Sequence, residues 1–152
     1  GTPINGRFIP EVEKLGIKIL EVKDVPIATT LVMTTRSFLK KDEEAARRFM
    51  KGYLAATRYY LTHRAESIQI IRRYFSSAPP EALENMYDAF AAQMAPYPIP
   101  NAEAVQSLID SVLAVDPRAK NLKPVDLFDL RFLQELKASG FIDNLYAEKT
   151  SL

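Results

Sequence analysis

The amphipathic segment that follows Asp42 is the feature that most restricts what this chain can fold into. Its apolar residues recur at intervals of three and four, which places them on one side of an α-helix. Asp42 is a suitable N-cap, and Glu43 and Glu44 stand in the first turn, where the helix macrodipole favours negative charge. The sequence therefore predicts a long helix with one buried side. The residues on that side are Ala46, Phe49, Met50, Tyr53, Leu54, Tyr60 and Leu61.

Four further segments have helical periodicity. The first runs from about Arg64 to Phe75, and the second begins near Pro80, a residue that suits the first turn of a helix. Asn101 is the expected cap of the third. The last, "DLFDLRFLQELKASG", begins at Asp126 and ends at Gly140. The sequence thus predicts about five helices after residue 42.

Two segments near the N-terminus have the pattern of strands. "IKILEV", Ile17–Val22, roughly alternates apolar and charged residues after Gly16, which stands where a helix would end. "TTLVMTT", Thr29–Thr35, is rich in β-branched residues. Because two strands do not hold a sheet alone, either the chain is helical with a small hairpin or the rest of the sheet lies elsewhere. The residues alone leave both alternatives open.

Composition excludes several classes of function. The 152 residues carry 20 basic and 19 acidic side chains, a net charge of +1, which argues against a nucleic-acid partner. There is no cysteine and a single histidine, His63, so neither a thiol nucleophile nor a cysteine-based metal site is expected. No apolar run is long enough to span a bilayer, and the segment "GTPINGRF" does not have the pattern of a signal peptide.

Three phrases, taken together and in order, resemble a known family. They are "GTPINGRFIPEVEKLGIKILEV", "TTLVMTTRSFLKKDEEAARRFMKGYLAATRYYLTHRAESIQIIRRYF" and "NAEAVQSLIDSVLAVDPRAKNLKPVDLFDLRFLQELKASGFIDNLY". They are similar to the C-terminal half of periplasmic substrate-binding proteins that serve ABC importers of nitrate, sulfonates, taurine and thiamine-type pyrimidines. The resemblance covers about residues 1–147.

This resemblance implies a helix-rich α/β fragment, part of a type II periplasmic-binding-protein fold, with two strands followed by about five helices. Residues 1–152 would form one unit of a two-lobe protein, with 1–28 as the segment that returns through the cleft and 29–152 as first-lobe strand and closing helices. It implies capture of a small solute by lobe closure, a membrane permease as partner and a periplasmic or otherwise extracytoplasmic location, without cofactor or catalysis. A pyrimidine-forming enzyme branch of the same fold is disfavoured, because it uses a cysteine-rich motif. An unpaired sheet edge would also favour a homodimer.

The resemblance places two groups of small polar residues near the ligand cleft. Thr2, Pro3 and Asn5 would lie in a loop with free backbone N–H groups, and Thr29 and Thr30 would offer hydroxyls at the mouth between lobes. The structural alternatives are an irregular N-terminal loop and ordinary threonines at the start of a strand.

Tyr97 is the other candidate ligand-binding residue. It lies between Pro96 and Pro98, which stiffen its backbone and would hold an exposed ring ready for contact. The equally weighted alternative is that its ring packs onto a neighbouring helix. Arg36 is better explained as a surface cation than as an anion ligand, and His63 as a solvated or capping residue than as a general base.

Tyrosines and aspartates complete the set of candidates. Tyr53, Tyr59, Tyr60, Tyr74 and Tyr87 could form an aromatic box, but their helical spacing favours packing. The aspartates lack the spacing of a calcium loop, so no metal site is predicted; they are Asp110, Asp126, Asp129 and Asp143. The alternative function for the chain is a stand-alone helical module for ligand sensing or protein interaction.

Overall fold

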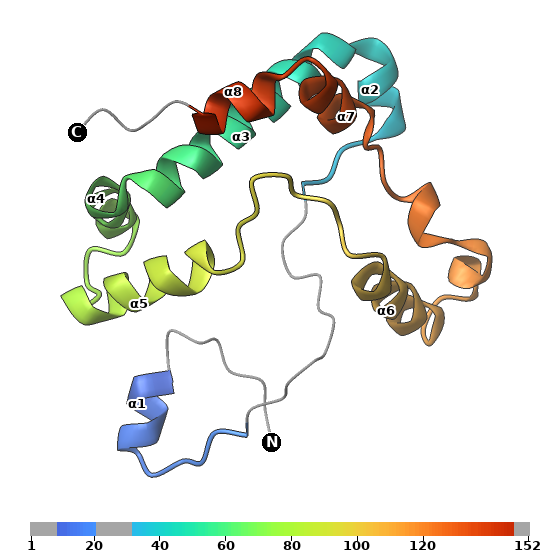
Figure 1. Cartoon of the computed structure of the whole chain (residues 1–152). Coiled ribbons are helices and arrows are strands. Elements are labelled where there is room, and N and C mark those ends of the chain that lie inside the picture. Colours follow the sequence, from blue (N-terminus) through green and yellow to red (C-terminus); the bar gives the residue numbers. More distant parts are fainter. Residues whose placement is uncertain (1–8, 21–31, 148–152) are drawn as a thin grey trace. The chain divides into compact units, whose positions relative to one another are not determined.

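The computed structural model describes residues 9–20 and 32–147 (Figure 1). Within these residues all regular structure is helical, and no strand is present. The elements are α1 (Ile9–Lys14), α2 (Arg36–Lys41), α3 (Glu43–Thr62), α4 (Arg64–Tyr74), α5 (Pro80–Ala91), α6 (Ala102–Leu113), the 3-10 helices η2 (Pro117–Asn121) and η3 (Pro124–Asp126), α7 (Arg131–Ala138) and α8 (Phe141–Ala147).

The predicted α/β fold with two strands is therefore wrong. At the first predicted strand, the backbone amide of Ile17 donates to the carbonyl of Val12 at 3.2 Å, and that of Gly16 donates to Glu13 at 2.9 Å. These two bonds, with Gly16 at a φ of 74°, close α1 by a Schellman motif. The prediction of Gly16 as a helix-ending glycine is confirmed. Ile17 thus uses its amide to end a helix, and the segment to Leu20 pairs with no described residue as a strand.

The second predicted strand ends as a helix cap. Its described part, Val32–Thr35, has no regular structure, and the Thr35 hydroxyl oxygen accepts the backbone N–H of Phe38 at 3.1 Å. This bond caps α2, a short helix that the sequence did not predict. The assignment to a type II periplasmic-binding-protein fold depended on both strands and is overturned with them. β-Branched composition is a weak guide, since a strand needs a neighbour to pair with.

The predicted helices are present, and their caps explain where most of them begin. An Asp42 carboxylate oxygen accepts the N–H of Ala45 at 2.8 Å, and the Asn101 side chain accepts the N–H groups of Glu103 and Ala104. Pro80 occupies the first turn of α5, as predicted. These short polar side chains satisfy amide groups that have no partner within their own helix.

The last helix differs from the prediction at both ends. It was expected to begin at Asp126, but that residue ends η3, and α7 begins at Arg131. Asp129 accepts the backbone N–H of Arg131 at 3.2 Å and so favours a start at this point. Gly140, with a φ of 74°, ends the helix as predicted, and the chain then forms the additional helix α8.

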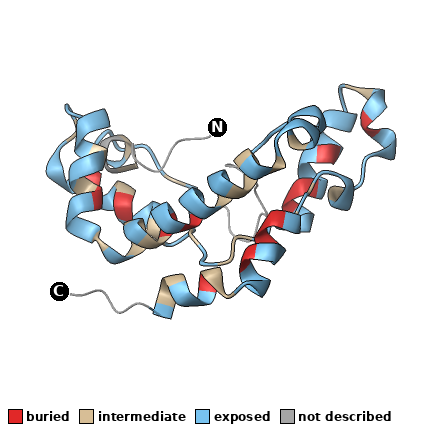
Figure 2. Ribbon diagram, turned by 90° about the horizontal axis from the view of Figure 1, so that it is seen from above, coloured by how far each residue is buried: buried red, intermediate tan, exposed pale blue. Residues whose placement is uncertain are grey.

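Contacts within the chain divide it into two compact units. The α4–α5 unit contains α1, the C-terminal end of α3, α4 and α5. Its core forms where α4 packs on α5, around the fully buried Leu83 and the nearly buried Thr57, Ser67 and Tyr87. Figure 2 shows such buried positions as short patches on largely exposed helices.

The second unit, the α6–α8 unit, contains α2, the first part of α3, and α6 to α8. Its main core cluster joins α3, α7 and α8 and consists of Leu54, Leu133, Leu136 and Ile142. Within the same unit, α6 packs on η2 and η3. The predicted buried side of α3 is only partly right, because Leu54 is fully buried whereas Phe49 is 53% exposed and stacks on Tyr53.

Candidate functional site

An apolar groove lies in the α4–α5 unit, within the described residues. Its volume is about 380 Å³, within the range of small-ligand sites. It lies on the C-terminal end of α3 and one side of α4. The lining residues are Ala56, Tyr59, Tyr60, Ser67, Ile70 and Ile71.

Helical spacing brings these residues together. Tyr59 and Tyr60 follow Ala56 by three and four residues on α3, and Ile70 and Ile71 follow Ser67 by the same steps on α4. The two helices meet at His63, where regular helix geometry breaks. A turn at this point lets the two helix sides face a common hollow.

The junction at His63 is held by its neighbours. The imidazole stacks on the ring of Tyr59, with centroids 4.2 Å apart and planes within 5°. The Thr62 hydroxyl donates to the carbonyl of Arg58 at 2.8 Å, and its oxygen lies 2.8 Å from Nδ1 of His63. His63 thus acts as a packed residue at a helix junction, and its side chain makes no cap bond to α4.

Tyr60 of α3 and Tyr87 of α5 hold these two helices together by reciprocal hydrogen bonds, an arrangement that we call the tyrosine clasp. The Tyr87 hydroxyl donates to the Tyr60 carbonyl at 2.8 Å, while the Tyr60 hydroxyl donates to the Tyr87 carbonyl at 3.3 Å. Their rings stack with centroids 4.7 Å apart. Partial burial raises the pKa of Tyr60, and the nearby Tyr87 and Asp88 raise it further. The clasp fixes the position of one wall of the groove.

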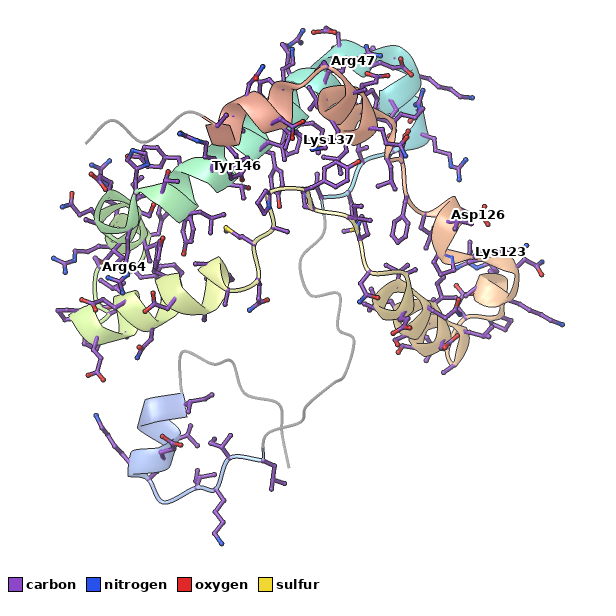
Figure 3. The ribbon with its side chains drawn as sticks, viewed as in Figure 1. Arg47, Arg64, Lys123, Asp126, Lys137 and Tyr146 are labelled. Carbon is purple, nitrogen blue, oxygen red and sulfur yellow. The ribbon has the colours of Figure 1, made fainter. Side chains whose placement is uncertain are left out.

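An ion pair at the edge of this unit supports the same arrangement. Arg64, labelled in Figure 3, directs Nη2 at a carboxylate oxygen of Asp88, 3.1 Å away, and its guanidinium lies 5.2 Å from the centre of the Tyr87 ring. Both partners are about half exposed, so the pair contributes little to stability by charge alone.

The groove has the chemistry of a binding surface for flat, apolar groups. Tyr59 and Tyr60 supply aromatic faces, and Ile70 and Ile71 supply aliphatic contact. The hydroxyl of Ser67, another lining residue, lies 3.5 Å from the Tyr60 carbonyl, to which it donates. Across residues 9–20 and 32–147, no group of acidic or histidine side chains is arranged to hold a metal ion.

Most of the predicted ligand-binding residues lie outside the described residues. These are Thr2, Pro3, Asn5, Thr29 and Thr30. Their predicted role therefore stays a prediction.

Tyr97 is described, and it belongs to the α6–α8 unit. It is half-buried and packs against the cluster that contains Leu54 and Leu133, while its carbonyl accepts the N–H of Ile99. This is the packing alternative that the sequence left open. Its role in ligand binding stays a prediction.

The groove was only partly foreseen. Tyr59, Tyr60 and Tyr87 were considered as members of an aromatic box. The first two line the groove, and Tyr87 is the partner of Tyr60 in the tyrosine clasp. Tyr53 and Tyr74 are not among the lining residues. Ala56, Ser67 and Ile70 were missed, although their spacing on two consecutive helices carries the signal. Only the angle at His63 shows that the two sides face each other.

No helix in the described part of the chain is both long and apolar enough to cross a membrane. Comparison with family models, with curated proteins and with solved structures finds no match to this chain.

Proposed function

We propose that this chain is a non-enzymatic binding component of an ABC import system, which captures a small anion or heterocycle. The observation that carries the proposal is the order of the three family-like phrases along the sequence. The positions of the helices support it, because α3 and α4 lie within the second phrase, while α6, α7 and all of α8 but its last residue lie within the third.

In this proposal the chain is the C-terminal portion of a larger, two-lobe solute-binding protein located in the periplasm. The solute is held by hydroxyl and backbone donors, with Thr2, Pro3, Asn5, Thr29, Thr30 and Tyr97 as the contact residues. Closure over the solute then creates the surface that a membrane permease recognises. The proposed homodimer needs another contact than a sheet edge, since the described residues contain none.

A thermal-shift screen tests this proposal. Nitrate, sulfonates and aminopyrimidines are added to the full protein encoded by the gene and, separately, to the 152-residue chain. A ligand at a hundredfold excess over its Kd stabilises the folded state by about 2.7 kcal/mol. We expect one ligand class to raise the melting temperature of the full protein and to have little effect on the chain. Tight binding of nitrate or an aminopyrimidine by the chain alone would contradict the proposal, as would a gene that encodes no further solute-binding lobe.

The second candidate function is a stand-alone helical module for ligand sensing or protein interaction. The apolar groove favours it, together with the wholly helical structure of the described residues. Indole is a suitable probe, because it offers a flat apolar ring with one N–H. We expect Ile70→Ser to weaken indole binding about tenfold by removing apolar contact. Ile99→Ser, at an exposed position outside the groove, is the control. Equal affinities in the two variants would exclude this site.

A further inference from the structure

A second hollow, in the α6–α8 unit, is lined by charged side chains. It has a volume of about 180 Å³, room for about six water molecules. It lies against α2, the start of α3 and the start of α7. The lining residues are Arg36, Leu39, Lys40, Glu43, Asp129 and Arg131.

Arg131 satisfies both carboxylates of this hollow. Its Nη1 donates to Glu43 at 3.0 Å, and its Nη2 donates to Asp129 at 2.9 Å. The hydrogen bonds from Arg131 hold the pKa of Asp129 below its ordinary value, and the charge of Arg36 contributes to this effect. Glu43 also lies 3.5 Å from the guanidinium of Arg47. Both acids are therefore already paired with arginine side chains.

Arg36 and Lys40 supply the remaining charge. They stand four residues apart on α2, so both lie on the same side of that helix. Arg36 uses Nη2 to donate to the backbone carbonyl of Asp126 at 2.9 Å, which anchors its guanidinium and leaves other N–H groups available. Asp126 is labelled on η3 in Figure 3. Within residues 9–20 and 32–147, no carboxylate pairs with Lys40.

We infer that this hollow binds a small oxyanion of the phosphate or sulfonate class, with Arg36 and Lys40 as its principal ligands. Three cations face two carboxylates here, so the site has an excess of positive charge. A guanidinium and an ammonium together offer the directed donors that tetrahedral oxyanions accept. The hollow shares no residue with the apolar groove, and none of the predicted ligand-binding residues lines it. The inference is therefore independent of the proposed function.

Titration of the 152-residue chain followed by ¹H–¹⁵N spectra tests the site. Inorganic phosphate represents a free anion, and methanesulfonate represents the same chemistry carried by an organic molecule. Ionic strength is held constant with sodium chloride, because exposed charges are screened by salt. We expect saturable shifts at amides from Arg36 to Glu43 and from Asp129 to Arg131 with at least one of the two probes, which also identifies the source of the anion.

Matched variants on α2 make the test specific. Lys40→Gln removes one ligand and should weaken binding about fivefold, the effect of losing one exposed charge pair. Lys41→Gln removes the same charge from the adjacent residue, which does not line the hollow, and should change affinity less than about twofold. Equal weakening by the two variants would show general charge attraction and overturn the inference. An absence of saturable shifts with both probes would overturn it too.

Discussion

At the scale of single residues, short polar contacts determine how the helices of this chain meet. Arg47 of α3 (Figure 3) donates from Nε to Glu135 of α7 at 2.8 Å. Tyr87 donates to the Tyr60 carbonyl in the last turn of α3, where backbone carbonyls have no partner within the helix. Each contact joins residues distant in sequence, so neither follows from local pattern.

The ion pair between Arg47 and Glu135 predicts a dependence on pH. The hydrogen bond from Arg47 lowers the pKa of Glu135 below its usual 4.5, against the opposing effect of desolvation. A carboxyl group with a lowered pKa stabilises the fold above its unfolded pKa, and this contribution is lost as the pH falls through the lowered value. We expect Glu135→Gln to show a weaker loss of unfolding free energy between about pH 5 and pH 2.

Urea unfolding at a series of pH values measures this effect. Glu81→Gln is the control, because Glu81 is exposed and has no ion pair within the described residues. It should follow the acid dependence of the unsubstituted protein. A Glu135→Gln profile that coincides with the control would show that the pair does not contribute.

The tyrosine clasp predicts a cost for loss of one hydroxyl. Tyr87→Phe removes the donor to the Tyr60 carbonyl and should lower the free energy of unfolding by about 1 kcal/mol. Tyr59→Phe is the matched control, since the described residues offer its hydroxyl no hydrogen-bond partner. Equal unfolding free energies for the two variants, measured in urea, would argue against the clasp.

At the scale of elements, caps decide where helices begin and glycines decide where they end. Asp42 and Asn101 cap α3 and α6, while Gly16 and Gly140 take the left-handed conformation that ends α1 and α7. These signals are local, because each involves a residue and the turn beside it. That is why the sequence predicted them.

Loss of the α6 cap is expected to destabilise the α6–α8 unit. Asn101→Ala leaves the amides of Glu103 and Ala104 without their acceptor and should cost about 1 kcal/mol. Asn101→Asp keeps the acceptor and adds a charge that the helix macrodipole favours, so it should retain stability. Thermal unfolding followed by circular dichroism compares the two, and an equal loss in both would show that the side chain does not act as a cap.

At the scale of the whole molecule, each of the two compact units has buried residues of its own within the described part of the chain. Leu54 belongs to the cluster of the α6–α8 unit, and Leu83 to the core of the α4–α5 unit. Both are fully buried, so truncation of either to alanine should cost about 2–5 kcal/mol. If each core stabilises its own unit, the two substitutions should destabilise different units.

Native-state hydrogen exchange distinguishes the two cores. We expect Leu54→Ala to speed exchange mainly in α7 and α8, and Leu83→Ala to speed it mainly in α4 and α5. The two variants serve as controls for each other, since the chemical change is the same. Faster exchange over the whole chain in both would show that the two units unfold together.

The sequence by itself determined the five longer helices after residue 42, several of their caps and the two helix-ending glycines, because these depend on periodicity and on contacts within one turn. It did not predict the short helices α2 and α8. It did not determine the fold class, since strand composition at Ile17–Leu20 and Val32–Thr35 has no effect without a neighbour to pair with. The apolar groove and the charged hollow were decided only by tertiary structure. Ala56 and Ile70 line one groove on either side of the turn at His63, and Arg36 and Asp129, 93 residues apart in sequence, line one hollow. The proximity of residues distant in sequence depends on how helices pack against one another, and local sequence patterns do not encode that packing.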